Sequence, residues 1–311
     1  MKKALVVLIV MVCLAAGIWG IFMLRGSAGK AGGHVENDNG NPGVATDVTE
    51  SGTTIEEQTA DSQETTEVTE EEKPSLVDET LAGMTLHEKV CQIMFVTPEE
   101  LTGEDGVTVA GDATRQALEN YPVGGIVYFA KNLESQDQVK EMIDNSQKYS
   151  SIGLFVATDE EGGVVNRLMD TVGTTYIGSM YYYKDDGDET AYENAYTIAN
   201  DMSALGFNLD FAPVADVWSN PDNTVIGERA YSDDYAQAAE LVGNAVKGFN
   251  DGGVMCTLKH FPGHGDTAED SHYSSAYVHR TKEEIMADEM QPFRSGIEAV
   301  SYTHLRAHET R

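Results

Sequence analysis

The sequence predicts an α/β fold built around a parallel β-sheet. From about residue 85, short apolar segments alternate with longer amphipathic ones, each apolar segment is bounded by Gly, Pro or Asp, and capping residues precede several amphipathic segments. Continuous apolar runs of this length are typical of strands that are buried on both faces. A repeated strand–helix order favours a parallel sheet with helices packed against it.

Five segments have the strand pattern, and two of the three cysteines, Cys91 and Cys256, are placed in strand-like apolar segments. We expect both to be buried free thiols, because so few cysteines exclude a disulfide scaffold and a four-cysteine zinc site. The predicted strands are residues 93–96, 123–129, 153–158, 207–212 and 254–258.

Helix-start signals mark the predicted helices between these strands. Thr85 with Glu88 forms a capping-box pattern, and Ser135 with Gln138 caps a helix that runs to about Lys148. A later helix has one apolar face, made by residues that repeat at intervals of three and four: Tyr235, Ala239, Val242, Val246 and Phe249.

The remaining elements extend the same pattern towards the C-terminus. A helix is predicted for residues 189–205, and Thr281 with Glu284 opens a last helix that Pro292 should kink or end. Five strands and their helices occupy residues 85–260, whereas a complete (β/α)8 barrel of ~250 residues would need roughly another hundred. The sequence therefore predicts an incomplete (β/α)8 TIM-type barrel with about five to six of its eight strands.

Charge and composition narrow the class of protein. The 311 residues include 20 Lys and Arg against 52 Asp and Glu, which gives a formal net charge of -32 and a pI near 4.3. This excess of carboxylates repels a phosphate backbone, so we expect no nucleic-acid partner. A hydrophobic fraction of 41% is enough for one sizeable core. Residues 76–300 alone carry -26, so the acidity belongs to the folded domain as well as to its linker.

The N-terminal segment is predicted to lie outside the folded domain. Lys2 and Lys3 precede 21 uncharged, mostly apolar residues, 4–24, which are followed by Arg25. A helix of that length can cross a bilayer. Residues 1–25 are therefore expected to be a transmembrane anchor or a cleaved signal peptide, which places the protein on the extracellular face of the membrane or in the medium. Residues 26–75 are acidic and rich in Thr and Glu, which predicts a disordered linker.

Polar side chains follow the third, fourth and fifth predicted strands. Asp159 and Arg167 come after the third strand, Arg229 after the fourth, and Lys259 and His260 directly after the fifth. Because the catalytic residues of such barrels come from the carboxyl ends of the strands, we expect these side chains to share one site. Cationic groups can donate to hydroxyls and a carboxylate can accept from two neighbouring hydroxyls, a combination that suits a sugar.

A second candidate group follows the fifth strand. Asp270 and His272 are two residues apart, so on an extended loop both side chains point the same way and the carboxylate can orient the imidazole. A histidine held in this way is a competent general acid/base near neutral pH. Asp216 also follows the fourth strand, and His264, which lies between two glycines, is expected to hold its loop.

Structural roles stay open for several of these side chains. Arg167 and Arg229 could equally be ion-pair partners in an acidic domain. Glu160 and Glu161 are expected to face solvent or to cap the next helix. The three tyrosines at 181–183 are expected to pack as an aromatic cluster in a loop rather than to serve as a platform for sugar.

These motifs resemble those of glycoside hydrolase family 3, specifically its β-N-acetylhexosaminidase branch, which acts on N-acetylglucosamine linkages. The resemblance covers about residues 80–300. Its most specific part is Lys-His-Phe-Pro-Gly-His-Gly at 259–265, followed by Asp-Ser-His at 270–272. The other matching motifs are residues 84–89, 123–126, 159–163 with Arg167, 208–217 and 226–229.

The resemblance implies roles for the residues at the matching positions. The groups that would hold the terminal N-acetylglucosamine are Asp159, Arg167, Arg229, Lys259 and His260. We expect no cofactor and no metal. The full-length protein would release terminal non-reducing β-linked N-acetylglucosamine from peptidoglycan or chitin-type fragments.

The chemistry implied by the resemblance departs from the usual pair of carboxylates. His272, paired with Asp270, would protonate the leaving oxygen and then activate water in a retaining mechanism, and phosphate stays open as an alternative acceptor. The family's nucleophilic aspartate comes from a strand after the region that matches 296–300. Residues 301–311 break the expected apolar strand and resemble read-through from an adaptor or vector, so we expect the 311-residue chain to be truncated within its barrel and inactive.

Two other functions are compatible with parts of the sequence. A non-catalytic carbohydrate-binding protein anchored to the cell wall is one. A metal-dependent hydrolase is the other, although no helical pair of histidines one turn apart is present and Lys259 would bring positive charge to the metal. The nitrogen and oxygen groups that would bind the metal are His260, His264, Asp266, Asp270 and His272.

Overall fold

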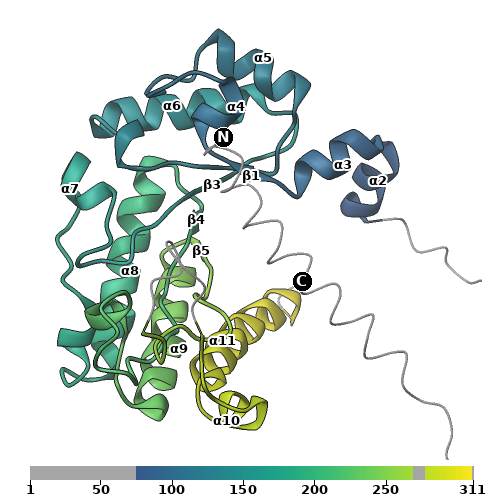
Figure 1. Ribbon diagram of the computed structural model, residues 1–311. Helices are drawn as coiled ribbons and strands as arrows, with labels where there is room; N and C mark the ends of the chain where they lie inside the picture. Colours follow the sequence, from purple (N-terminus) through teal and green to yellow (C-terminus); the bar gives the residue numbers. More distant parts are fainter. Residues whose placement is uncertain (1–74, 269–276, 310–311) are drawn as a thin grey trace, which may run out of the picture. The chain divides into compact units, whose positions relative to one another are not determined.

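The computed structural model describes residues 75–268 and 277–309, all of which belong to one compact unit (Figure 1). The predicted anchor or signal segment and almost all of the predicted linker lie outside the described residues, as do Asp270 and His272. No helix within the described ranges is both long and apolar enough to cross a membrane.

A five-stranded parallel sheet forms the centre of the domain, with its strands side by side in the order in which they occur along the chain. Each observed strand lies inside one of the five predicted segments, which confirms their placement. The strands are shorter than those segments because the flanking residues continue with isolated hydrogen bonds, such as Tyr128 N–H to Ala157 O at 2.9 Å. The strands are β1 (Phe95–Val96), β2 (Gly125–Val127), β3 (Phe155–Thr158), β4 (Leu209–Asp210) and β5 (Met255–Cys256).

Helices connect the strands and cover the sheet. Successive helices α5, α6, α8, α9 and α11 contact one another in that order, as in the outer layer of a barrel (Figure 1). The α-helices are α2 (Leu76–Gly83), α3 (Leu86–Gln92), α4 (Pro98–Thr102), α5 (Asp112–Asn120), α6 (Gln136–Tyr149), α7 (Leu168–Val172), α8 (Asp188–Leu205), α9 (Tyr235–Asp251), α10 (Lys282–Ala287) and α11 (Met290–Glu309). Three 3-10 turns are η1 (Ala130–Asn132), η2 (Met180–Tyr183) and η3 (Gly227–Arg229).

The predicted caps are confirmed, and they correct one placement. Thr85 and Thr281 both form capping boxes, and the Ser135 side chain accepts from the backbone of residue 138. Because the Thr85 box starts a helix that continues to residue 92, Cys91 lies in helix α3 rather than in a strand. Pro292 lies in the first turn of α11, where its missing N–H costs no hydrogen bond, and the preceding helix ends at residue 287.

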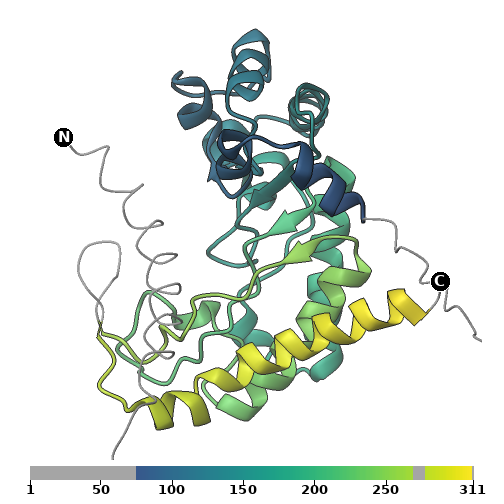
Figure 2. The same cartoon turned by 90° about the vertical axis from the view of Figure 1, so that its right-hand side faces the viewer.

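Helix α9 packs between α8 and α11, and Figure 2 shows α11 in yellow running alongside it. Its buried face differs from the predicted one, because Tyr235 and Ala239 are only half-buried. A Cβ at Gly248 would meet the Tyr192 carbonyl oxygen at 2.3 Å, so glycine here lets α9 approach α8 closely. The buried apolar side chains of α9 are Ala238, Leu241, Val242, Ala245, Val246 and Phe249.

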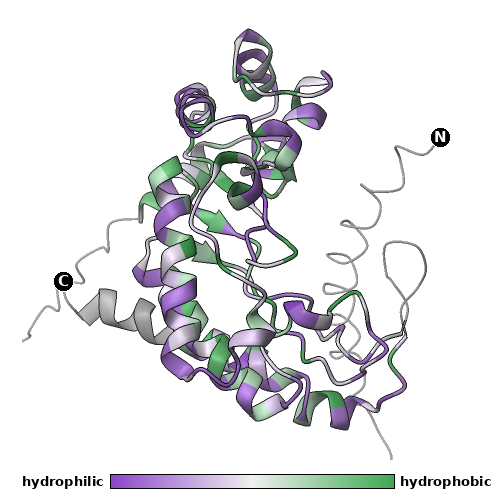
Figure 3. Cartoon of the chain, turned by 90° about the vertical axis from the view of Figure 1, so that its left-hand side faces the viewer, coloured by the Kyte–Doolittle hydropathy of each residue, from purple (hydrophilic) through white to green (hydrophobic). Residues whose placement is uncertain are grey.

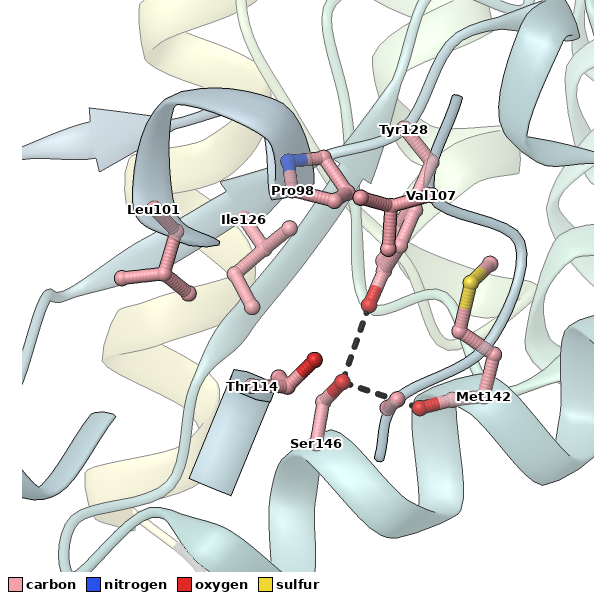
Figure 4. A pocket seen from close by; sticks show the side chains of 9 residues that line it. Pro98, Leu101, Val107, Thr114, Ile126, Tyr128, Met142 and Ser146 are labelled. Atoms are coloured by element: carbon pink, nitrogen blue, oxygen red, sulfur yellow. Dashed lines mark hydrogen bonds between the residues drawn. The ribbon is translucent and has the colours of Figure 1, made fainter. Parts of the chain in front are cut away.

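The apolar core lies between the sheet and these helices, and Figure 3 shows the strands in the green of hydrophobic residues. One small void remains in it, between β2 and helices α4, α5 and α6 (Figure 4). There the Tyr128 hydroxyl lies 3.0 Å from Ser146 Oγ, which itself donates to the Met142 carbonyl at 2.9 Å. The lining is otherwise almost entirely apolar, so this void is part of the core packing.

The sheet is open among the described residues, since β1 and β5 pair only with their inner neighbours. Phe95, Phe155 and Met255 are 38%, 41% and 46% exposed, and they line an open hollow with Leu209 and Cys256. Five parallel strands in sequential order with intervening helices are the arrangement of an incomplete (β/α)8 barrel, which confirms the predicted fold class.

Candidate active site

The structure brings the five residues predicted to bind sugar together at the carboxyl ends of the strands. Asp159 follows β3 and Arg167 directly precedes α7, whereas Arg229 ends η3, and Lys259 and His260 follow β5. All five side chains are partly accessible, with exposed fractions between 13% and 36%. Three strand-end loops therefore contribute to one continuous surface.

Ion pairs join four of these side chains, and a further carboxylate, Glu161, links Lys259 to Arg229. Lys259 Nζ lies 2.8 Å from Asp159 Oδ1 and 2.5 Å from Glu161 Oε1. The Arg229 guanidinium donates to both oxygens of Glu161 at 2.8 Å, through Nε and Nη2. Arg167 Nη2 lies 4.0 Å from Asp159 Oδ2, at the edge of this network.

The prediction that Glu161 faces solvent or caps the next helix is wrong. Its side chain is only 3% exposed and pairs with Arg229. Burial disfavours its charged form, but the hydrogen bonds from Arg229 and the charge of Lys259 hold the pKa of Glu161 below its usual range. The pair gives Arg229 the structural role that the sequence left open. The signal for Glu161 was its spacing, since residues two apart on an extended chain lie on the same side, and Asp159 is two residues away.

Glu160 points the other way and caps α7, which was one of the two predicted alternatives, although the side chain is buried. Its carboxylate accepts from the backbone N–H groups of Arg167, Leu168 and Met169 at 2.6, 2.8 and 3.2 Å. Burial raises the pKa of Glu160, and these N–H groups offset part of the effect. The cap fixes the backbone at Arg167, which carries one of the candidate sugar-binding groups.

Asp210, the last residue of β4, is fully buried and hydrogen-bonded to the same loop. Its Oδ1 accepts from the Glu160 N–H at 3.0 Å, and its Oδ2 has no hydrogen-bond partner among the described residues. Burial, together with the negative charge of Glu160, raises the pKa of Asp210 well above its usual range. Burial thus favours the protonated, uncharged form of the Asp210 carboxyl group, which lies beneath the loop that carries Glu160.

Asp216 orients His260 and joins the loops after β4 and β5. Its buried carboxylate lies 2.5 Å from His260 Nδ1 and also accepts from the backbone N–H groups of His260 and His264, at 3.1 and 2.7 Å. A carboxylate only accepts, so Nδ1 carries the proton and Nε2 keeps its lone pair. That lone pair faces Arg229 Nη2 at 3.4 Å.

Gly265, next to His264, lets the loop after β5 pack closely against the loop after β4. A Cβ at Gly265 would meet the Val217 carbonyl oxygen at 1.7 Å, so no other residue fits there without movement of the backbone. His264 Nδ1 lies 2.6 Å from the Thr267 hydroxyl, within the same loop. The prediction that His264 holds its loop is confirmed.

The tyrosines at 181–183 only partly form the predicted cluster. Tyr181 packs edge-on against Trp218, with ring centroids 5.0 Å apart, and the Tyr183 hydroxyl accepts from the Gly178 N–H at 3.1 Å. Tyr182 differs, because it is 69% exposed and its ring meets Tyr181 edge-on.

Two predicted groups have no structural test here. Asp270 and His272, the predicted acid/base pair, lie outside the described residues. Within the described residues, no group of three or more His, Cys, Asp and Glu side chains could hold a metal ion. Asp270 and His272 are two of the five side chains in the metal-hydrolase alternative, so that alternative rests on residues outside this description.

The described surface suits an uncharged ligand that carries several hydroxyl groups. Lys259 and Arg167 offer donors, and Asp159 offers a carboxylate that can accept from two hydroxyls. Because Glu161 compensates two of the cations, the surface lacks the excess of positive charge that an anionic ligand would require.

Comparison with known proteins decides the family. Residues 85–309 match the N-terminal domain of glycosyl hydrolase family 3, and this match covers most of the chain. The chain belongs to glycosyl hydrolase family 3. The family 3 chain is 35% identical over 192 residues to a beta-hexosaminidase A from Pseudoalteromonas piscicida, a match that covers 59% of this chain and 32% of the relative.

A second curated relative and a known structure agree. A beta-hexosaminidase from Haemophilus influenzae is 36% identical over 184 residues, covering 58% of this chain and 51% of the relative. A family 3 beta-N-acetylglucosaminidase from Paenibacillus sp. superimposes with a TM-score of 0.64 and 38% identity, over 69% of this chain and 40% of that protein. The family 3 chain thus spans about a third to a half of the length of these relatives.

Proposed function

We propose that the protein, in its full-length form, is an exo-acting glycosidase that hydrolyses terminal non-reducing β-linked N-acetylglucosamine, or a related N-acetylhexosamine, from peptidoglycan or chitin-type fragments. One observation carries this proposal: Asp159, Arg229, Lys259 and His260, from three separate strand-end loops, form one ion-pair and hydrogen-bond network. The names of the relatives, beta-hexosaminidase and beta-N-acetylglucosaminidase, support the same substrate class.

In this proposal the network binds the terminal sugar. Lys259 and Arg167 donate to ring hydroxyls, and Asp159 accepts from two adjacent ones. His260 lies beside the terminal sugar, with its ring oriented by Asp216 through Nδ1–H and by Arg229 through Nε2. Glu161 holds Lys259 and Arg229 in place and compensates their positive charges.

The proposed chemistry is a retaining double displacement. A carboxylate forms a bond to the anomeric carbon while His272, oriented by Asp270, gives its proton to the departing glycosidic oxygen. His272 then takes a proton from water, whose oxygen displaces the carboxylate and releases the sugar. The resemblance places the nucleophilic aspartate after the region that matches 296–300, and we propose that the 311-residue chain binds sugar weakly at best and does not turn it over.

Localisation to the extracellular face of the membrane, or secretion, belongs to the same proposal. It is supported by Lys2, Lys3 and the apolar run that follows them in the sequence. Cell fractionation separates the two alternatives, because an anchored protein stays with the membranes at high salt and a secreted one reaches the medium. Recovery in the cytoplasmic fraction would contradict both.

The experiment that tests the function compares this chain with a longer form that continues into the rest of the family 3 barrel. We expect the longer form to release nitrophenol from 4-nitrophenyl N-acetyl-β-glucosaminide and the 311-residue chain to release none. Lys259→Met in the longer form should abolish most activity, because the donor to the sugar and the partner of Asp159 are both lost. Lys247→Met, an exposed lysine on α9, is the matched control and should be fully active. Turnover by the 311-residue chain, or full activity of Lys259→Met, would overturn the proposal.

A further inference from the structure

An exposed aromatic surface lies beside the candidate sugar site, on the long segment between β3 and α8. Tyr176, Tyr182 and Val164 are 75%, 69% and 61% exposed, although each is a large apolar or aromatic side chain. Exposed aromatic side chains that gather at a hollow mark a binding surface more often than isolated ones do.

Two adjoining hollows flank Tyr182, with volumes of about 480 and 470 Å³. Val164, Tyr182 and Glu228 line both of them, so Tyr182 stands at their shared edge. The first hollow reaches Arg229, a member of the candidate sugar site, and the second reaches Tyr176. Each volume is in the range of small-ligand sites, and together they continue the sugar-binding surface outward.

The surface is built on a fixed base. Tyr181, next to Tyr182, packs edge-on against Trp218, and its hydroxyl lies 3.0 Å from Lys184 Nζ and 3.1 Å from Asp233. On the other side of Tyr182, the Gly178 backbone donates to the hydroxyl of residue 183. The backbone that carries Tyr182 is therefore flanked by two anchored side chains, while most of the Tyr182 ring stays open to solvent.

The polar groups around the ring indicate the chemistry of the occupant. The first hollow adds the hydroxyl of Thr224, and the Glu228 side chain interacts with the Tyr182 hydroxyl at the edge shared by both hollows. A sugar ring presents C–H groups on its faces and hydroxyls at its rim, which match an aromatic face bordered by hydroxyl and carboxylate groups. Glu228 adds negative charge here, which disfavours an acidic occupant.

We propose that Tyr182 and its two flanking hollows form an additional sugar subsite, which binds the rings of a neutral β-linked amino-sugar oligosaccharide next to the terminal residue. The terminal ring lies at the Asp159 and Lys259 network, the next ring stacks on Tyr182, and a third reaches the hollow lined by Tyr176. This inference rests on the proposed function, because it assigns the outer part of the same substrate. It makes chain length, rather than the terminal sugar alone, a determinant of affinity.

The test is a binding experiment on the 311-residue chain, with Trp218 as the reporter. Trp218 lines the first hollow and only one other tryptophan is present, so a Trp19→Phe background leaves a single fluorophore at the site. N-acetylglucosamine and its β-1,4-linked dimer and trimer are titrated separately, and ligand-observed NMR provides a second readout of binding. We expect the trimer to bind more tightly than the monosaccharide.

Variants at Tyr182 separate the outer subsite from the terminal one. Tyr182→Ala should weaken trimer binding by about three- to tenfold, the range expected for losing one aromatic stacking contact, and leave monosaccharide binding unchanged. Tyr182→Phe keeps the ring and should stay within about twofold of the parent. Tyr121→Ala, an exposed tyrosine at the end of α5, is the matched control and should change neither ligand.

The outcomes distinguish this inference from the proposed function. Monosaccharide binding with no gain for the trimer, or a trimer affinity that Tyr182→Ala leaves intact, overturns the subsite and leaves the terminal site standing. Absence of binding for all three sugars overturns the subsite on this chain, whereas the nitrophenol assay on the longer form decides the proposed function separately. Binding of the trimer that falls with Tyr182→Ala and survives in Tyr182→Phe supports the subsite.

Discussion

The buried carboxylate of Asp216 and the imidazole of His260 form a hydrogen bond of 2.5 Å between Oδ2 and Nδ1. The same carboxylate accepts two backbone N–H groups from the loop after β5, at His260 and His264. Asp216 therefore sets both the tautomer of His260 and the course of the loop that carries it. This arrangement also directs Nε2 of His260 towards Arg229 Nη2, at 3.4 Å.

Replacement of Asp216 by alanine leaves three N–H donors without their acceptor. We expect Asp216→Ala to lower the free energy of unfolding by about 3 kcal/mol, because three donors each lose a hydrogen bond to a charged acceptor. Asp216→Asn keeps one acceptor oxygen and should cost less. Urea denaturation measures the effect, and Asp222→Ala, an exposed aspartate in the same loop region, is the control. A cost below about 1 kcal/mol for Asp216→Ala would contradict this role.

We expect the protein to lose stability in acid because the folded state lowers the pKa of Glu161. Its pKa is below the usual value when folded, so its stabilising effect is complete above the unfolded pKa and is lost as the pH falls through the folded one. Glu161→Gln should cost about 3 kcal/mol near neutral pH, because Lys259 and Arg229 lose their shared partner.

The pH dependence separates this role from a general packing defect. The difference between parent and Glu161→Gln should shrink as the pH falls below about 4, where the parent loses the same ion pairs. Glu141→Gln, an exposed glutamate on α6, should follow the parent at every pH. A gap between Glu161→Gln and the parent that stays constant with pH would rule out the ion pairs as its cause.

Asp210 should contribute the opposite pH dependence of stability to that of Glu161. Its folded pKa is raised, so the folded state holds the proton more tightly, and stability is lost as the pH rises from the unfolded pKa towards the folded one. Asp210→Asn removes this penalty and should raise the unfolding free energy at neutral pH by roughly 1–3 kcal/mol. The gain should vanish near pH 4, as thermal or urea unfolding across pH can measure. If Asp210→Asn were less stable than the parent at neutral pH and in acid alike, the buried charge would not be the cause.

Thiol reactivity provides an independent check of the core. Burial, with the nearby charge of Asp210, raises the pKa of Cys256 to about 12, and burial also raises the pKa of Cys91. Cys256 is half-buried rather than buried as predicted, so its reactivity depends on its pKa more than on access. In a Cys13→Ser, Cys91→Ser background, native Cys256 should react with a thiol reagent at pH 8 about a thousandfold more slowly than a free cysteine, since the thiolate is the reactive form. Unfolding in urea should restore its full reactivity, and rapid labelling of the native protein would contradict the raised pKa.

The sequence predicted the fold well because each signal was local. Apolar runs located all five strands, and Thr85, Ser135 and Thr281 located three helix starts through their own side chains. The errors arose where tertiary contacts decide. The buried face of α9 depends on its packing against α8 and α11, and the position of Cys91 depends on how far α3 continues.

The candidate site was predictable in its residues and less so in its connections. The five predicted sugar-binding groups do meet at one surface, because parallel strands place their carboxyl ends on one side of the sheet. Their partners were harder to foresee. Glu161 was expected at the surface or at a helix cap, and Asp216 had no assigned role, because burial and ion pairing involve residues 44 to 100 positions apart.

The Glu160 cap makes α7 a reporter of the intact site. The amide protons of Arg167, Leu168 and Met169 all depend on that one carboxylate, which Asp210 in turn holds through the backbone. Opening of this short helix would therefore release Arg167 from its place beside Asp159. Hydrogen exchange at these three amides, as ligand is added, would measure how often the candidate site opens in solution.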